Sequence, residues 1–166
     1  MKKGKQKKVK EKSEKDALLV KKFFPDVSLP EYALPSDVGF DLRANETITL
    51  APLEQKEVKT GIAIQIPEGH VGLVRDRAGI ITKMNVHTAA GTFDPAYRGE
   101  VSVILVNFGD DSVQIEKGMR IAQMIILPVK KVKIKEVKQL PVTERYDRGF
   151  GSTGMKHIIK QLGDLS

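Results

Sequence analysis

The chain has 166 residues, and 40% of them are apolar, which is enough for one domain with a true hydrophobic core. It contains no cysteine, and this excludes a disulfide scaffold, a thiolate nucleophile and a cysteine-based metal site. The net charge is +7, but residues 1–16 hold eight lysines against three acidic residues, a balance of +5. The remaining chain is therefore nearly neutral, which argues against a basic nucleic-acid-binding module.

Residues 1–16 have almost no apolar side chains that could offset the entropy lost on folding, so we predict a disordered tail. A solubilising role is one interpretation of this tail, and weak contact with nucleic acid through its lysines is the other. No apolar run is long enough to span a membrane, and no apolar signal core follows the basic start. We expect a cytoplasmic protein without membrane contact, and the Lys-rich start leaves a nuclear or organellar location open.

Beyond the tail, short apolar stretches of strand length are separated by Pro and Gly. At residues 39–44, Asp41 and Arg43 share one face of such a stretch. Residues 62–66 alternate Ile with other residues, which predicts a half-buried strand, whereas residues 101–108 are apolar on both faces, as in a central strand. The sequence predicts an all-β fold of many short strands, arranged as a sandwich or a barrel.

Two arginines close a predicted strand at residues 75–80, where the sequence reads RDRAGI. A planar guanidinium binds oxyanions with two parallel hydrogen bonds, and a glycine lets a ligand approach the backbone closely. The pattern indicates a phosphate clamp around Arg77 and Gly79. A solvated pair of arginines at a strand end is the alternative.

The segment GTFDPAYRGEV, residues 91–101, brings Asp94, Tyr97 and Arg98 together between glycines. Glycine-bounded segments between strands commonly form hairpins. Such a hairpin can offer backbone N–H and C=O groups to a planar base, Tyr97 can provide a flat surface, and Asp94 can act as a base that activates water. Because Asp-Pro is also common in turns, a purely structural turn is the alternative.

Two further patterns lie in the C-terminal half of the chain. Gln123 is predicted on the same strand face as Ile121 and Ile125, and a buried amide needs a hydrogen-bond partner. That partner could be backbone, another subunit or a ligand. At residues 131–135, Lys alternates with Val and Ile, which predicts an edge strand whose lysines discourage further pairing.

A glycine-rich run with one aromatic residue, ERYDRGFGSTG, occupies residues 144–154. It lacks the Lys-Ser/Thr ending of a P-loop, but its N–H groups and the hydroxyls of Ser152 and Thr153 suit phosphate oxygens. We predict a segment that closes over a ligand, and a flexible tail without a role is the alternative. Residues 155–162 have the periodicity of a short helix.

Five of these segments, in this order, resemble the five motifs of the trimeric deoxyuridine triphosphate nucleotidohydrolases, the dUTPases. The segments are GFDLRA, RDRAGI, GTFDPAYRGEV, GMRIAQM and RYDRGFGSTG. Each motif alone is a weak signal, but five in sequence with similar spacing are specific. The resemblance covers about residues 20–154.

The resemblance implies a β-jelly-roll (β-clip) sandwich that forms a homotrimer with flexible arms at both ends. It divides the chain into the tail at 1–16, the jelly-roll domain at 17–140, a glycine-rich arm at 141–154 that closes the active site, and an extension at 155–166. It also implies a Mg²⁺-assisted dUTP diphosphatase that converts dUTP to dUMP and pyrophosphate. Such an enzyme limits uracil incorporation into DNA and supplies dUMP for thymidylate synthesis.

The resemblance also gives each site residue a role. Asp94 would activate the water that attacks the α-phosphorus. Mg²⁺ would be held mainly by substrate phosphates and waters, with Asp41 in the surrounding network of waters and charges. The base and sugar would be bound by Thr88, Gly91, Thr92, Tyr97 and Phe150. The phosphates would be bound by Arg77, Ala78, Gly79, Gln123, Arg145, Gly151, Ser152 and Thr153.

The chain departs from the family at Ala78, where a Ser that contacts phosphate is usual, and at Arg148, where Gly is usual. One charged hydrogen bond is worth about 1.5–3 kcal/mol, so the missing hydroxyl predicts reduced rather than abolished activity. A non-catalytic dUTP-binding regulator of the same fold is one alternative. A related deoxycytidine triphosphate deaminase is another, although Ile104 stands where that family has its catalytic Glu, and Glu100 lies too near the turn.

Overall fold

The structure is a computed structural model that describes residues 17–143. The chain divides into a compact unit that ends at Lys131 and a second unit that begins at Val132. The described part of the second unit, residues 132–143, contains no helix or strand. The predicted tail at 1–16, the glycine-rich run at 144–154 and the predicted helix at 155–162 lie outside the described residues.

Residues 17–143 form ten strands and one short helix, so the chain is all-β as predicted. In chain order the elements are β1 (Leu19–Lys22), β2 (Gly39–Arg43), β3 (Ile48–Leu50), β4 (Gln55–Gln65), β5 (His70–Arg75), α2 (Ala78–Met84), β6 (Val86–Ala89), β7 (Thr92–Phe93), β8 (Glu100–Asn107), β9 (Val113–Ile115) and β10 (Arg120–Pro128).

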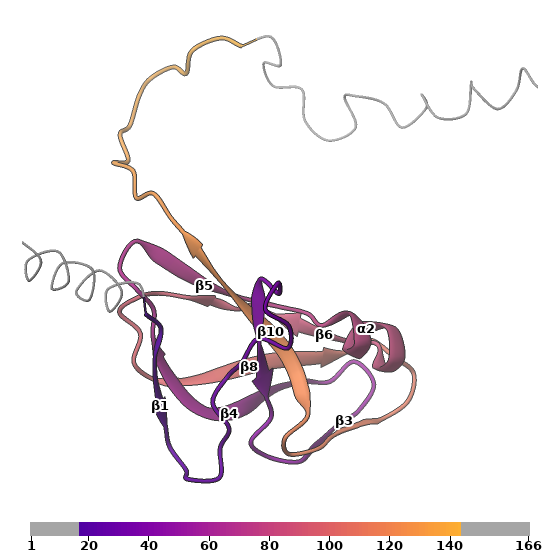
Figure 1. The fold of residues 1–166 in the computed structure, drawn as a ribbon. Coiled ribbons are helices and arrows are strands. Elements are labelled where there is room, and N and C mark those ends of the chain that lie inside the picture. The colour runs from indigo at the N-terminus through magenta and orange to yellow at the C-terminus, as the bar shows by residue number, and fades with distance from the viewer. Residues whose placement is uncertain (1–16, 144–166) are drawn as a thin grey trace, which may run out of the picture. The chain divides into compact units, whose positions relative to one another are not determined.

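Two four-stranded sheets make up most of the first unit (Figure 1). The first sheet has the order β1-β4-β8-β6, and the second has the order β2-β10-β5-β7. Strands β3 and β9 form a separate pair. All of the strand pairs are antiparallel, and neighbours such as β10 and β2 are far apart in the sequence. The two sheets form a jelly-roll sandwich, as the resemblance implied.

One hydrophobic core joins the two sheets. The first sheet contributes Val58 and Leu105, and the second contributes Leu42 and Met124; each of these side chains is almost completely buried. Burying one such aliphatic side chain stabilises a fold by about 1.5–3 kcal/mol. The predicted face of Phe40 and Leu42, opposite Asp41, is therefore the core face of β2.

The two strands predicted from apolar patterns are present. The three Ile side chains of residues 62–66 are all buried, and β8 lies between β4 and β6 in the middle of the first sheet. The two faces of β8 differ, however. Val101 and Val103 face the core, whereas Ile104 and Val106 remain partly exposed on the other face.

The predicted hairpin that contains residues 91–101 is present, and its strands are β6 and β8. Strand β7 pairs with β5 in the second sheet, and β8 pairs with β6 in the first sheet. Ala90 and Gly91 have positive φ values of 64° and 126°, and these two residues turn the chain from one sheet to the other. The hairpin is therefore a wide one whose strands are β6 and β8, and residues 90–99 form its connection.

Two predictions need correction. Helix α2 was not expected, because it has only seven residues and buries only Ile80, too little for a visible helical period. The edge strand predicted at residues 131–135 is not formed, and Ile134 is 99% exposed. Alternating Lys with Val and Ile favours extended backbone, but a strand also needs a partner ladder, and the described residues provide none there.

Candidate active site

Asp41 on β2 is held between two arginines. Its Oδ1 lies 2.8 Å from Nε of Arg77, and its Oδ2 lies 3.2 Å from Nε of Arg120. The Asp41 side chain is only 8% exposed, so the two guanidiniums compensate a carboxylate that has lost its water. The contact with Asp41 uses Nε of Arg77, and the Arg77 side chain is still 31% exposed. The cluster carries one excess positive charge, which suits an anionic ligand.

The partner of the Gln123 amide is a backbone carbonyl. Gln123 on β10 lies opposite Arg75 at the end of β5, and its Nε2 donates a hydrogen bond to the Asp76 carbonyl at 2.9 Å. A register shift between Arg120 and Ala122 breaks the period of two in β10, so Gln123 is half-buried rather than aligned with the buried Ile121. The amide is therefore fixed a short distance from Arg77.

Ala78 and Gly79 form the first turn of α2, directly after Arg77, and both are exposed. No atom outside the helix lies within 4 Å of where a Gly79 side chain would begin. The backbone at Gly79 is thus open to a ligand from outside the chain. Both residues lie on the same side of the fold as Arg77, as a phosphate clamp requires.

Gly91 and Thr92 line a hollow of about 190 Å³. Its other walls come from Val74 on β5 and from Ser102 and Ile104 on β8. Gly91 packs so closely on β5 that an added side chain would lie 2.8 Å from the Val74 Cβ. The hollow combines apolar walls with open backbone, which suits a flat heterocycle.

Thr88 was expected to contact the base, but it has a partner inside the chain. Its backbone N–H donates a hydrogen bond to Oδ1 of Asp76 at 2.6 Å. The neighbouring His87 Nδ1 lies 3.3 Å from Oδ2 of the same carboxylate. The Thr88 N–H is therefore engaged by Asp76, and the neighbouring Ala89 lines the hollow beside Gly91.

Asp94 and Tyr97 occupy a turn between β7 and β8. The Tyr97 N–H donates a hydrogen bond to the Asp94 carbonyl at 3.1 Å, and the Tyr97 hydroxyl donates to the Glu100 carbonyl at 3.1 Å. The Tyr97 ring meets Phe93 edge to face, with 5.8 Å between the ring centroids. Asp94 is exposed, and it lines an open cleft together with residues of the β5 start, including Val71.

The two groups of candidate residues lie at opposite ends of β5. Asp94 shares its cleft with Val71, near the start of that strand, whereas the Gln123 amide is bonded to Asp76, just past its end. A strand rises about 3.3 Å per residue, so Val71 beside Asp94 and Arg75 opposite Gln123 are about 13 Å apart along β5. One chain therefore holds Asp94 and Gln123 at separate places along this strand.

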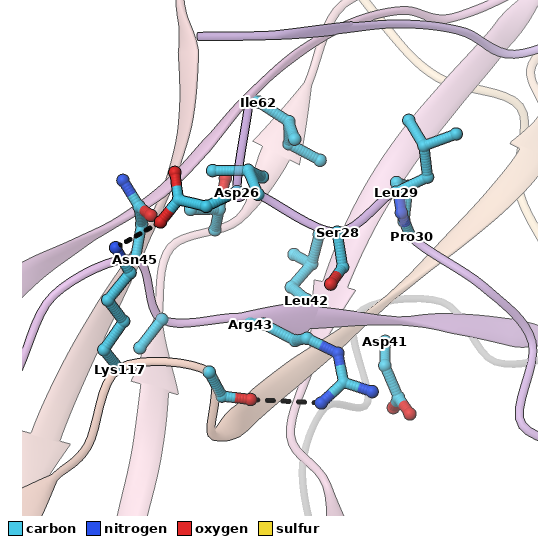
Figure 2. Close-up of a pocket in the computed structure, with 14 residues that line it drawn as sticks. Asp26, Ser28, Leu29, Pro30, Asp41, Leu42, Arg43, Asn45, Ile62 and Lys117 are labelled. Atoms are coloured by element: carbon cyan, nitrogen blue, oxygen red, sulfur yellow. Dashed lines mark hydrogen bonds and ion pairs between the residues drawn. The ribbon is translucent and has the colours of Figure 1, made fainter. Parts of the chain in front are cut away.

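A small hollow beside β2 is not the substrate site. Its volume is about 70 Å³, against about 190 Å³ for the hollow at Gly91, and among residues 17–143 Asp41 is the one predicted site residue that lines it. At its rim, Arg43 donates a hydrogen bond to the Gly118 carbonyl, and Lys117 pairs with Asp26 (Figure 2). The hollow has room for a few water molecules only.

Five of the predicted site residues lie outside the described part of the chain: Arg145, Phe150, Gly151, Ser152 and Thr153. Within residues 17–143, no three His, Asp or Glu side chains gather as a metal site would require. In the same residues, no helix is long and apolar enough to cross a membrane.

Residues 26–154 match the family model described as dUTPase. A deoxyuridine 5'-triphosphate nucleotidohydrolase from a Hydrogenobaculum species is 49% identical over 142 residues, which span 84% of this chain and 99% of the relative. The chain belongs to the dUTPase family. A second relative of the same name, from Clostridium kluyveri, is 46% identical over 82% of this chain and 97% of its own length.

Solved dUTPase structures have the same fold. The dUTPase of Staphylococcus bacteriophage 80alpha, solved with dUPNHPP, matches with a TM-score of 0.79 and 32% identity, over 84% of this chain and 99% of that one. A dUTPase mutant from phage phi11 of S. aureus, which coordinates a structural Mg(II) ion, matches with a TM-score of 0.71 and 26% identity, over 76% of this chain and 99% of that one.

Three residues of this dUTPase-family chain were not given a role from the sequence. They are Asp76, which bonds to β6 and β10; His87, which faces Asp76; and Arg120, which shares Asp41 with Arg77. Asp76 and Arg120 stand inside the RDRAGI and GMRIAQM segments. Their partners are 11 or more positions away in the sequence, so spacing alone gave no signal for these contacts.

Proposed function

We propose that this chain hydrolyses dUTP to dUMP and pyrophosphate, and thereby limits uracil incorporation into DNA and supplies dUMP for thymidylate synthesis. The observation that carries the proposal is the match to deoxyuridine 5'-triphosphate nucleotidohydrolases over almost their full length, together with the Asp94 turn next to the hollow at Gly91. The phage 80alpha structure with dUPNHPP supports a uracil nucleotide as the ligand class.

The active site is composite, with parts from different copies of the chain. The separation of about 13 Å along β5 between the positions of Asp94 and Gln123 supports this, because the resemblance gives both residues roles at the α-phosphate. Ile104 and Val106 leave an apolar face of β8 partly exposed, as an interface between copies would. The resemblance to trimeric dUTPases makes the assembly a homotrimer with three sites.

The base and sugar occupy the hollow at Gly91 and Thr92, and the Tyr97 ring packs against the deoxyribose. A ring pressed against the sugar leaves no room for a 2′-hydroxyl, and a closed pocket rejects the methyl group of thymine. One methyl group in a pocket is worth only about 1–3 kcal/mol, so further selectivity comes from hydrogen bonds between the backbone and the base.

Asp94 orients a water molecule and accepts its proton. The water oxygen forms a bond to the α-phosphorus, and the bond between that phosphorus and the bridging oxygen of the β-phosphate breaks. Pyrophosphate leaves with the bridging oxygen, and dUMP keeps the oxygen of the water. General-base assistance of this kind typically contributes about 10²–10⁴-fold to the rate.

The phosphates bind at Arg77, Ala78, Gly79 and Gln123 of another copy. The Arg77 side chain pairs with Asp41 through Nε and is still 31% exposed, so a ligand can reach it. Both Asp41 oxygens already pair with arginines, and no cluster of three ligands occurs in residues 17–143, so the donor set fits Mg²⁺ held by the triphosphate and by waters. Mg²⁺ would neutralise phosphate charge there.

The glycine-rich run supplies the last contacts. Arg145, Gly151, Ser152 and Thr153 bind the phosphates, and Phe150 covers the base. These assignments rest on the resemblance of RYDRGFGSTG to the fifth dUTPase motif. A cytoplasmic location, supported by the absence of cysteine, completes the proposal.

Pyrophosphate release from dUTP with Mg²⁺, run beside dTTP, dCTP and UTP, tests the function. We expect turnover of dUTP alone, and Asp94→Asn should lower kcat at least about 100-fold while a non-hydrolysable dUTP analogue still binds. Asp110→Asn, in an exposed turn, is the matched control and should keep wild-type turnover. Binding of dUTP without turnover by the wild-type protein would instead support the regulator, and release of ammonia from dCTP would support the deaminase.

A further inference from the structure

Asp76 stands between β5 and α2 and bonds to two other segments of the chain. Its backbone carbonyl accepts the hydrogen bond from Gln123 on β10. Its carboxylate accepts the 2.6 Å bond from the Thr88 N–H on β6 and lies 3.3 Å from His87 Nδ1. Arg77 is the next residue in the chain. One aspartate thus links the phosphate-binding end of the second sheet to β6 of the first sheet.

The surroundings of Asp76 favour its charged form. Burial alone would raise the pKa of Asp76, but hydrogen bonds from the hydroxyl and backbone N–H of Thr88 and from His87 outweigh burial and hold the pKa below its ordinary value. Hydrogen bonds from N–H groups to a charged carboxylate are about twice as strong as those between neutral groups. The His87 ring also packs edge to face on Phe108, with 5.3 Å between the ring centroids.

We propose that Asp76 is a positioning residue for the triphosphate. Its ionised carboxylate anchors the segment between β5 and α2 to Thr88 and His87, and this fixes Arg77 and the Gln123 amide in place. The carboxylate itself faces β6, so Asp76 acts through Arg77 and Gln123 rather than by touching the substrate. The inference rests on the proposed function, because it takes dUTP as the ligand.

A positioning role at the phosphates can be distinguished from a general loss of structure by comparing ligands with different numbers of phosphates. Asp76 does not line the hollow at Gly91, and the Tyr97 hydroxyl bonds to the Glu100 carbonyl. Contacts to base and sugar should therefore survive the loss of the Asp76 carboxylate better than contacts to the phosphates. The loss of affinity on replacing Asp76 should therefore be larger for ligands that carry more phosphates. A partly unfolded protein would lose all ligands in the same proportion.

The test compares Asp76→Ala with the wild-type chain. Binding of a non-hydrolysable dUTP analogue and of dUMP is measured by calorimetry, together with kcat and KM for dUTP. Asp37→Ala is the matched control, because Asp37 also accepts a backbone hydrogen bond, from the Leu34 N–H at 2.9 Å, in a different loop. A wild-type chain that neither binds nor hydrolyses dUTP would refute the proposed function before this inference is reached.

We expect Asp76→Ala to weaken analogue binding by about tenfold or more, to weaken dUMP binding less than about threefold, and to raise KM more than it lowers kcat. Asp37→Ala should match the wild type. Equal losses for both ligands, or no loss beyond that of Asp37→Ala, would overturn the inference. If Asp76→Ala does not fold, Asp76→Asn replaces it: it keeps an acceptor oxygen but not the charge, and unchanged analogue affinity would overturn the inference as well.

Discussion

At the residue scale, the phosphate half of the site depends on how charges are paired. Asp41 is almost fully buried, and it is stable there because Arg77 and Arg120 each place an Nε on one of its oxygens. The same pairing holds the Arg77 guanidinium in one orientation. The sequence placed Asp41 correctly on the face opposite the core, but its pairing with Arg120 depends on the register of β2 and β10, which no local pattern encodes.

Asp41→Asn should destabilise the fold, because it leaves two arginines without their carboxylate. The arginine side chains keep about a third of their surface in water, so we expect roughly 2 kcal/mol rather than the roughly 3–5 kcal/mol typical of fully buried pairs. Urea unfolding measures the loss. Glu31→Gln, which removes the exposed 3.7 Å pair with Arg43, should cost less than about 0.5 kcal/mol, and equal costs would contradict this account.

Asp76 should also make stability depend on pH in the acid range. Its pKa in the folded chain lies below the ordinary value of 3.8, so its contribution to stability is fully present above pH 3.8 and is lost as the pH falls through the folded pKa. We expect the difference in unfolding free energy between the wild type and Asp76→Asn to shrink as the pH falls below 3.8. A difference that stays constant down to pH 3 would contradict the assignment.

At the scale of elements, the wide hairpin of β6 and β8 shapes the base-binding half. Its connection crosses to the second sheet, pairs briefly with β5 as β7, and returns, so that Gly91, Thr92 and Ser102 surround one hollow. The crossing requires two successive residues with positive φ, at Ala90 and Gly91. Glycine at the second of them removes a steric cost that any other residue would bear.

Gly91→Ala should therefore destabilise the chain by at least about 1 kcal/mol, because its φ is 126° and its Cβ would lie 2.8 Å from that of Val74. Gly79→Ala makes a matched comparison in α2, where nothing lies within 4 Å and φ is ordinary. It should be neutral or stabilising by up to about 1 kcal/mol. Urea unfolding of both variants gives the two values, and a Gly79 variant as unstable as the Gly91 variant would contradict the assignment.

The sequence predicted strands correctly where an apolar pattern extended over the length of a strand. Residues 62–66 were predicted as a strand because Ile recurs with a period of two, and residues 101–108 because they are continuously apolar over the length of a strand. Helix α2 and the crossing to β7 were not predicted, because the first has only seven residues and the second depends on two backbone conformations. The edge strand at 131–135 was wrong because alternation shows propensity and not the presence of a partner strand.

At the scale of the whole molecule, the dUTPase motifs fall into two groups within one chain. Asp94 and Tyr97 lie near the start of β5, whereas Gln123 lies opposite Arg75 at its end and bonds to the carbonyl of the next residue. The hollow at Gly91 lies beside Val74, near the end of β5. The order of the five motifs identified the family from sequence alone. Their separation in one chain did not follow from the sequence, because it depends on which end of β5 each loop reaches. We infer that copies of the chain complete one another's sites.

Subunit complementation between Asp94→Asn and Arg77→Ala tests this claim most directly. Each variant alone should be nearly inactive, because every site in the proposed trimer lacks either Asp94 or Arg77. When equal amounts are unfolded together and refolded, random mixing gives about a quarter of the sites both intact halves, so roughly a quarter of the wild-type dUTP hydrolysis should return. A mixture no more active than the two separate variants would contradict a site built from different copies of the chain.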